Sequence, residues 1–194
     1  MKKIVITDRD KEIIQFLKDF KVATTTIISD LYFNSSLRPC QRRLKYLYEH
    51  GYIKSYQENV ITEKIHYTRK KPINLKHALV LSEFISKLKV NNIKLLKYKV
   101  PYKIDHVIAD AFVAINMNGQ NKIYFVEVEN RKKFDLDNYE KLYYSRKWKD
   151  IFPVFPDIIV ISDKPVINST KFNIITLKFN HICSTFDISM TFPF

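Results

Sequence analysis

Glycine and cysteine are scarce in this chain of 194 residues, which contains two of each. Gly51 and Gly119 cannot form a glycine-rich phosphate loop, so nucleotide hydrolysis of the P-loop kind is excluded. Cys40 and Cys183 lie far apart and share no metal-ligand spacing with each other or with a histidine. The sequence therefore indicates neither a disulfide framework nor a zinc site, and its cysteine usage fits a reducing cytoplasm.

Long hydrophobic runs are also lacking. No window approaches the roughly 18 consecutive apolar residues of a membrane-spanning helix, and the run Ile4-Val5-Ile6 is too short for the core of a signal peptide. We therefore expect a cytoplasmic protein with no membrane partner. Hydrophobic residues still make up 46% of the chain, which is enough to build a core.

Acidic residues are outnumbered, since 33 Lys and Arg oppose 20 Asp and Glu and give a formal net charge of +13. The excess is denser in residues 1–76, where 16 basic and 8 acidic residues give a net charge of +8. This balance favours a polyanion as partner, because Lys and Arg that neutralise phosphates release condensed counterions. A merely soluble basic protein is the alternative interpretation of the charge.

Three segments near the N-terminus have the spacing of amphipathic helices and are preceded by capping or turn residues. Helices are predicted over residues 8–20, 25–32 and 36–50. Thr7 begins the first, and Gly51 ends the third just past His50. Two short strands over 52–56 and 64–67 then form a hairpin.

A winged helix-turn-helix domain is the fold that this order of helices and hairpin predicts. We place the domain at residues 1–72, because the basic run that ends at Pro72 is typical of a linker. Such domains bind duplex DNA through their last helix before the hairpin.

The predicted helix over 36–50 has one apolar face that includes Leu44, Leu47 and Tyr48. Its other face is polar and basic and consists of Arg38, Gln41, Arg42 and Lys45. Side chains of these types reach base edges and phosphates in the major groove. Basic residues in and after the hairpin are predicted to contact phosphates, namely Lys54, Lys64, Arg69 and Lys70. An ordinary solvated basic face is the alternative for the helix.

The remaining residues, 73–194, mix strands with helices, which predicts an α/β domain with a mixed sheet. Helices are expected over residues 77–88 and 134–152. Strands are expected over residues 107–117, 122–129, 158–161 and 172–179. A turn at 118–121 makes the first two strands a hairpin.

Acidic residues in two of these strands are the candidates for catalysis. Asp110 lies in the first strand, and Glu127 and Glu129 lie two apart on the next, so the two glutamates face the same side. Carboxylates gathered in this way can hold Mg²⁺ and orient water for phosphodiester hydrolysis. The alternative is structural, with Asp110 as a hydrogen-bonded buried group and the glutamates paired with cations. A nuclease would also need a lysine near the last carboxylate, where Glu129 stands.

Two groups of motifs resemble the replication-relaxation family of plasmid and mobile-element proteins. The first group lies in the predicted helices and hairpin and comprises Thr7–Asp10, Leu31–Phe33, Arg42–Leu47 and Gly51–Ile53. The second comprises His77, Asp110–Phe112, Tyr124–Glu129, Tyr139 with Lys141, and Pro153 before Ile158–Ile161. The first group resembles the winged-helix half of that family. The second is similar to its C-terminal region, which looks like the core of the PD-(D/E)xK nuclease fold.

The resemblance implies an α+β protein in which a winged helix-turn-helix precedes a mixed-sheet core like that of restriction endonucleases. Two departures bear on activity. Ala109 stands where a nuclease motif often has proline, and Glu129 replaces the lysine, although Lys141 on the following helix could substitute for it. The simpler implication is a nuclease-like domain that does not catalyse and serves assembly or additional DNA contact.

We therefore expect a sequence-specific duplex-DNA-binding protein of a plasmid, phage or conjugative element, acting without a cofactor in replication, transfer or transcription control. A homodimer is expected because one helix-turn-helix reads only a half-site, and other replication or transfer proteins are candidate partners. The alternative is a Mg²⁺-dependent DNA nuclease in which Asp110 and Glu127, with Glu129 as a further candidate ligand, hold the metal and Lys141 assists. An RNA-binding or scaffolding protein is a third hypothesis.

Overall fold

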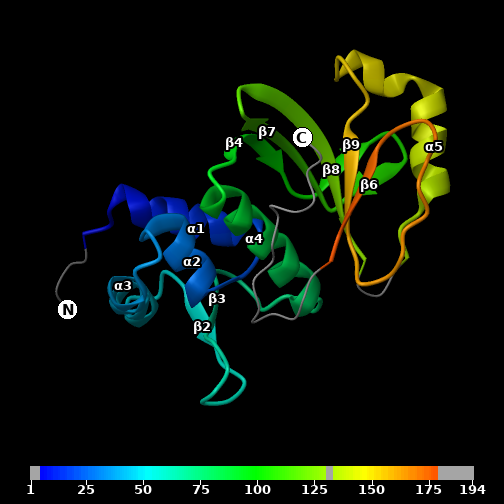
Figure 1. Cartoon of the computed structure of the whole chain (residues 1–194). Coiled ribbons are helices and arrows are strands. Elements are labelled where there is room, and N and C mark those ends of the chain that lie inside the picture. The colour runs from blue at the N-terminus through cyan, green and yellow to red at the C-terminus, as the bar shows by residue number, and fades with distance from the viewer. Residues whose placement is uncertain (1–4, 130–132, 179–194) are drawn as a thin grey trace. The chain divides into compact units, whose positions relative to one another are not determined.

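The computed structural model describes residues 5–129 and 133–178 of an α+β chain with a mixed sheet, which confirms that coarse part of the expected fold class. The chain divides into two compact units, Met1–Val90 (unit 1) and Asn91–Phe194 (unit 2). Figure 1 shows helices gathered in the first unit and a broad sheet in the second. Cys183 and the last residue of the strand expected over 172–179 lie outside the described residues.

Unit 1 consists of helices and a small antiparallel sheet. Its elements are α1 (Asp8–Asp19), β1 (Ala23–Thr24), α2 (Thr25–Tyr32), α3 (Leu37–Glu49), β2 (Lys54–Tyr56), β3 (Ile65–Tyr67) and α4 (Leu75–Val90). The strand order is β1-β3-β2. The central strand β3 is therefore antiparallel to both of its neighbours, so the β2–β3 hairpin is joined through β1 to the start of α2.

Local capping fixes where the first two helices begin. The Thr7 hydroxyl accepts a hydrogen bond from the Asp10 amide, and the Asp10 carboxylate accepts one from the Thr7 amide at 2.7 Å, so α1 begins with a capping box. The Thr24 hydroxyl caps α2 by accepting a hydrogen bond from the amide of Ile27. These contacts agree with the helix starts expected from the sequence.

The turn between α2 and α3 depends on residues that tolerate the left-handed conformation. Asn34 and Ser35 adopt φ values of 49° and 59°, which reverse the chain within four residues of the end of α2. At its other end, α3 stops in a Schellman motif, in which Gly51 (φ 76°) donates to the Tyr48 carbonyl and Tyr52 donates to the Leu47 carbonyl. The sequence prediction that Gly51 ends this helix is confirmed.

Helix α4 belongs to unit 1, which moves the division of the chain from the expected residue 72 to residue 90. The helix contacts α2 and β1 and buries Phe84 and Leu88. The Ser82 hydroxyl donates a hydrogen bond to the Val22 carbonyl at 2.5 Å. The basic run that ends at Pro72 is therefore a connection within this unit, because the helix that follows it packs on the preceding helices.

Unit 2 is built on a five-stranded mixed sheet. Its elements are β4 (Lys94–Lys99), β5 (Tyr102–Ile104), β6 (Val107–Ala109), β7 (Ala111–Met117), β8 (Gln120–Val128), α5 (Leu136–Ser145), the 3-10 helix η1 (Lys147–Asp150), β9 (Asp157–Ile161) and β10 (Ile174–Leu177). The order is β10-β9-β8-β7-β4. Neighbours are antiparallel from β4 to β8 and parallel from β8 to β10.

Two elements of unit 2 are shorter than the sequence suggested. The strand expected over 107–117 is interrupted at Asp110, because its carboxylate accepts the Val128 amide at 2.8 Å where the backbone ladder would continue. The helix expected over 134–152 ends at Ser145, because Arg146 adopts a left-handed φ of 59° before η1 begins. The first break places a carboxylate at the end of β7, beside the sheet.

Aromatic side chains fill the core between the sheet and the segment that follows it. Phe112 and Phe125 project from the sheet and share this core with Tyr139 of α5 and Trp148 of η1. The Phe112 and Phe125 ring centroids lie 6.2 Å apart in an edge-on arrangement. Helix α5 therefore covers the sheet face to which Glu127 also belongs, since Glu127 lies two residues from Phe125 along β8.

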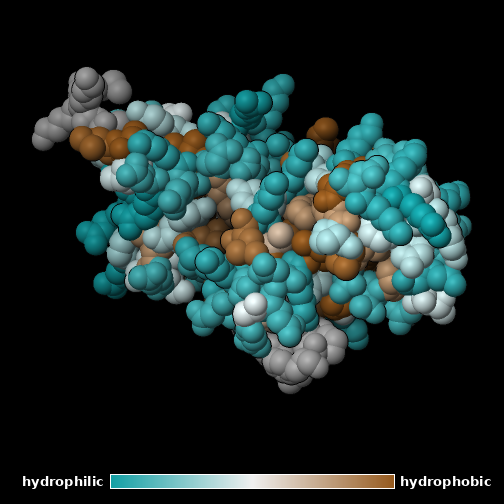
Figure 2. All heavy atoms as spheres, turned by 90° about the horizontal axis from the view of Figure 1, so that it is seen from above, coloured by the Kyte–Doolittle hydropathy of each residue, from teal (hydrophilic) through white to brown (hydrophobic). Residues whose placement is uncertain are grey.

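Hydrophilic residues cover most of the face seen in Figure 2, with smaller hydrophobic areas between them. Within residues 5–129 and 133–178, no helix combines the length and the hydropathy that a membrane span requires.

Candidate functional site

One face of α3 consists of four exposed polar or basic side chains, which we call the α3 face: Arg38, Gln41, Arg42 and Lys45. The opposite side of the helix is buried through Cys40, Leu44 and Leu47. The expected burial of Tyr48 is wrong, since this side chain is 53% exposed. Cys40 takes its place in the buried stripe because residues 40, 44 and 47 follow the helical repeat more closely.

Arg43 lies beside the α3 face but has a structural role that sequence reasoning did not assign. Its Nε donates to Asp10 Oδ1 at 2.8 Å, a terminal nitrogen pairs with Asp10 Oδ2, and the same nitrogen donates to the Val5 carbonyl. The Asp10 side chain is fully buried. Desolvation opposes its ionisation, yet hydrogen bonds from Arg43 and Thr7 lower the pKa of Asp10 to about 2. The ion pair therefore joins α3 to α1.

The first turn of α3 leaves its positive end open. Ser36 occupies the cap position without a side-chain hydrogen bond, and the first turn contains no acidic residue. Amide groups at such a helix end carry partial positive charge that favours an anion. Arg38, in the same turn, adds a full positive charge, so this end of the helix is suited to a phosphate.

A hollow of about 720 Å³ separates α3 from the β2–β3 hairpin. On the helix side it is lined by Gln41, Lys45 and Tyr48, and on the hairpin side by Tyr56 and Lys64, among others. The amine of Lys45 lies 3.7 Å from a Glu49 carboxylate oxygen at the helix surface. Two residues of the α3 face, Gln41 and Lys45, thus border the same hollow as the hairpin within unit 1.

His66 forms part of the inner wall of this hollow. Its ring nitrogens lie 3.0 Å from the Thr25 hydroxyl and 3.0 Å from the Ser55 hydroxyl. Desolvation, followed by the charge of Lys64, lowers the pKa of His66 to about 4. The imidazole is therefore neutral near pH 7, and its two hydrogen bonds fix β3 to the first residue of α2 and to β2.

Four of the predicted phosphate contacts lie on or after the hairpin and are exposed: Lys54, Lys64, Arg69 and Lys70. The amine of the next residue, Lys71, lies 3.4 Å from the centre of the Tyr56 ring. This cation–π contact holds the basic run against β2. All eight predicted DNA-contacting side chains are therefore on the surface of unit 1.

The candidate catalytic carboxylates of unit 2 are hydrogen-bonded within the protein. The β7–β8 register places Asp110 opposite Glu127, one step beyond the Ala111–Val126 pair. Asp110 accepts the Val128 amide, and Glu127 accepts the Tyr139 hydroxyl at 2.5 Å. Burial and then the Glu127 charge raise the pKa of Tyr139 well above its usual value, so the phenol remains a donor.

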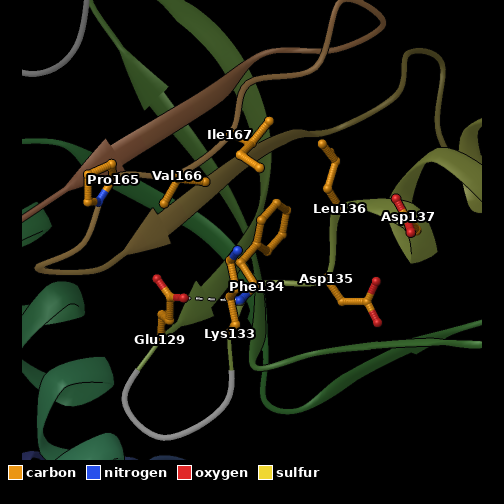
Figure 3. Close-up of a pocket in the computed structure, with 9 residues that line it drawn as sticks. All are labelled: Glu129, Lys133, Phe134, Asp135, Leu136, Asp137, Pro165, Val166 and Ile167. Atoms are coloured by element: carbon orange, nitrogen blue, oxygen red, sulfur yellow. Dashed lines mark hydrogen bonds between the residues drawn. The ribbon is translucent and has the colours of Figure 1, made fainter.

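Glu129 and Lys141 do not join this carboxylate pair. Glu129 accepts hydrogen bonds from the Ser162 hydroxyl and, at 3.3 Å, from the Phe134 amide. Figure 3 shows it at one side of a hollow of about 460 Å³, apart from the carboxylates of Asp135 and Asp137. Lys141 is exposed and lies two residues from the buried Tyr139, on a different side of α5.

The residues present do not fit a metal centre of the expected kind. Within residues 5–129 and 133–178, no group of three or more His, Cys, Asp or Glu side chains is arranged to hold a metal ion. Asp110 and Glu127 have hydrogen-bond partners within the protein, and Lys141 is exposed. The pair is placed to brace the end of β8 against β7 and α5.

Comparison of the chain with protein-family models, curated proteins and solved structures finds no match. The resemblance to the replication-relaxation family stays a prediction. The chemistry of the site therefore rests on the residues of the chain itself.

Proposed function

We propose that this chain is a sequence-specific duplex-DNA-binding protein and that the part of unit 1 from α1 to β3 is a winged helix-turn-helix domain. Helix α3 enters the major groove. The observation that carries the proposal is the exposure of the whole α3 face on a helix whose other side is buried in the core of unit 1. A helix fixed in this way presents its polar side chains in a constant arrangement.

The chemistry of the α3 face fits base recognition. An arginine such as Arg38 or Arg42 can donate two hydrogen bonds to O6 and N7 of guanine, and Gln41 can pair with N6 and N7 of adenine. Residues near the N-terminus of a recognition helix reach the base edges most deeply. Arg38, Gln41 and Arg42 lie in the first two turns of α3, whereas Lys45 lies farther along and suits a phosphate.

Phosphate contacts supply the remaining affinity. Lys54 and Lys64 on the hairpin, and Arg69 and Lys70 after it, are exposed cations that can neutralise phosphates on either side of the groove. Each neutralised phosphate releases counterions, so binding should weaken steeply as salt rises. The open first turn of α3 adds a further phosphate position.

Selection from random duplexes tests this function. We expect the full-length protein to enrich one common sequence, since base contacts from α3 discriminate by about 1–3 kcal/mol per bidentate pair. An inverted repeat with half-sites about 10 base pairs apart would support the homodimer that we also propose. Enrichment of no sequence, or equal binding of duplex DNA and RNA competitors, would contradict the proposal.

We further propose that unit 2 has a nuclease-like fold without catalytic activity and serves assembly or additional DNA contact. Three antiparallel strands, β4, β7 and β8, followed by the α5 connection to parallel β9, support the fold. The engagement of Asp110 and Glu127 in internal hydrogen bonds, and the outward position of Lys141, support the lack of catalysis. A plasmid, phage or conjugative element is the setting that we propose, in replication, transfer or transcription control.

A nicking assay separates this proposal from the nuclease alternative. Supercoiled plasmid incubated with the protein and Mg²⁺ or Mn²⁺ should remain intact, because among the described residues no third His, Cys, Asp or Glu joins the carboxylate pair to hold a metal ion, and Lys141 is exposed. Asp110→Ala serves as the matched control for contaminating nucleases. Nicking by the wild type that disappears in this variant would establish the nuclease and contradict our proposal.

A further inference from the structure

Three exposed lysines lie along β4, at the edge of the five-stranded sheet of unit 2. They are Lys94, Lys97 and Lys99, and we call them the β4 lysines. Figure 1 shows β4 next to β7 at one side of the sheet, and β4 is the last strand in the order β10-β9-β8-β7-β4. A row of like charges costs free energy through mutual repulsion unless an anion compensates it.

An irregularity in the register between β4 and β7 places all three lysines on one face of the sheet. Alternate residues of a regular strand face opposite sides, so residues 94 and 97 would then face opposite ways. The register passes over Leu96, which is an extra residue of β4 at this point. The partners of the β4 lysines are therefore every second residue of β7 and share one face: Asn116, Ala114 and Phe112.

The sequence around the β4 lysines contains no carboxylate. Residues 91–104 contain four lysines and residues 111–126 contain one, and neither range contains Asp or Glu. The next carboxylate along the chain, that of Asp105, lies 2.7 Å from the amine of Lys147. Within residues 5–129 and 133–178, no ion pair involves the β4 lysines. Their charge is therefore not compensated by a neighbouring side chain.

We propose that the β4 lysines bind the phosphate backbone of duplex DNA without regard to base sequence. The inference rests on the proposed function, because it names the part of unit 2 that makes the additional DNA contact. Lysine neutralises a phosphate as a compact charge and releases condensed counterions, so such contacts add affinity but no sequence preference.

The length of the row agrees with the spacing of phosphates. Five residue steps from Lys94 to Lys99 span at most about 17 Å of strand. One strand of B-DNA carries a phosphate about every 3.4 Å along the helix axis, so about five phosphates lie within this length. Each β4 lysine can therefore meet its own phosphate. The amine of Lys99 also lies 5.6 Å from the centre of the Tyr102 ring, a contact that orients the side chain and leaves its charge uncompensated.

Protection of the sheet edge is the alternative role for these residues. Lysines and irregular register on an edge strand discourage pairing with the edge of another sheet. That role requires charge on the edge, but it does not require the absence of carboxylates from residues 91–104 and 111–126. An anionic partner accounts for both features, because nearby carboxylates would repel phosphates. The charge therefore favours the DNA backbone as the partner of this edge.

Replacement of the three β4 lysines by glutamine in the full-length protein tests the inference on a duplex of unrelated sequence. We expect the slope of log affinity against log salt to become less steep by about 2.7, which is about 0.9 for each lost phosphate contact. Between about 50 and 200 mM salt, the wild type should lose about 40-fold more affinity than this triple variant. A matched control removes the same charge from exposed lysines outside the strands and should keep the slope within about one of the wild type: Lys18→Gln, Lys164→Gln and Lys171→Gln.

Binding to the selected duplex separates this inference from the proposed function. The triple variant should keep the ratio of affinities for the selected and the unrelated duplex, because the α3 face is unchanged. An unchanged salt slope together with a wild-type ratio would overturn the inference and leave the proposed function intact. Absence of any sequence preference in the wild type would overturn the proposed function, while the two salt slopes would still decide whether the β4 lysines contact DNA. Self-association of the triple variant at an unchanged slope, measured by sedimentation, would assign the lysines to edge protection and overturn the inference.

Discussion

Replacement of Arg38, Gln41 and Arg42 together by alanine is expected to weaken binding to the selected duplex by at least about 100-fold, because each base contact contributes about 1–3 kcal/mol. All three side chains are exposed and the buried stripe of α3 is untouched, so the fold should persist. Fluorescence anisotropy at one fixed salt concentration measures the affinity, and circular dichroism checks that the helices remain.

A comparison of the selected duplex with an unrelated duplex shows whether the lost contacts are to bases or to phosphates. Binding to an unrelated duplex should fall much less than binding to the selected one, because phosphate contacts from the hairpin remain. Lys54→Ala is the matched control, expected to weaken both duplexes alike and to reduce the salt slope by about one. Equal losses on every sequence would show that the α3 face contacts only phosphates, and unchanged affinity would remove α3 as the reading helix.

The second large expected effect is a difference in stability between alanine variants of the adjacent residues Arg42 and Arg43. Arg43→Ala should reduce the free energy of unfolding by about 3–5 kcal/mol, because it leaves the fully buried Asp10 carboxylate without its cation. Arg42→Ala should leave the stability within about 0.5 kcal/mol of the wild type, since Arg42 is exposed. Urea titration followed by circular dichroism compares the two variants.

A rescue experiment checks the cause. Asp10→Asn in the Arg43→Ala background should recover part of the lost stability, because asparagine keeps an acceptor for the Thr7 amide and removes the buried charge. The Arg42→Ala variant should lose DNA affinity and keep the stability of the wild type, whereas the main expected effect of Arg43→Ala is a loss of stability. Equal stability of the two single variants would mean that the Asp10–Arg43 pair contributes nothing measurable.

Local features of unit 1 could be predicted from the sequence because they depend on neighbouring residues. Thr7 with Asp10, and Gly51 after His50, satisfy helix-end groups within one turn, so their spacing alone marks the boundaries. The exposure of Arg38 and Arg42 follows from the same periodicity that buries Leu44. These features need no knowledge of distant contacts.

Features set by long-range packing could not be predicted in the same way. The partner of Arg43 is 33 residues distant, although an arginine between Cys40 and Leu47 on the buried side of a helix does signal the need for a carboxylate. Helix α4 joins unit 1 through contacts with α2 that no linker-like composition reveals. The break at Asp110 depends on an amide of the adjacent strand.

The Asp10–Arg43 pair also sets the angular position of α3 about its own axis. Successive residues of a helix are about 100° apart, so a turn of the helix by one residue would carry a different group of side chains to the front. The ion pair between Arg43 and the buried Asp10 resists such a rotation, while the exposed side chains on the other side of α3 can be exchanged without breaking it. Under the proposed function, exchange of exposed α3 residues should therefore change which DNA sequence is bound while the orientation of the helix stays the same.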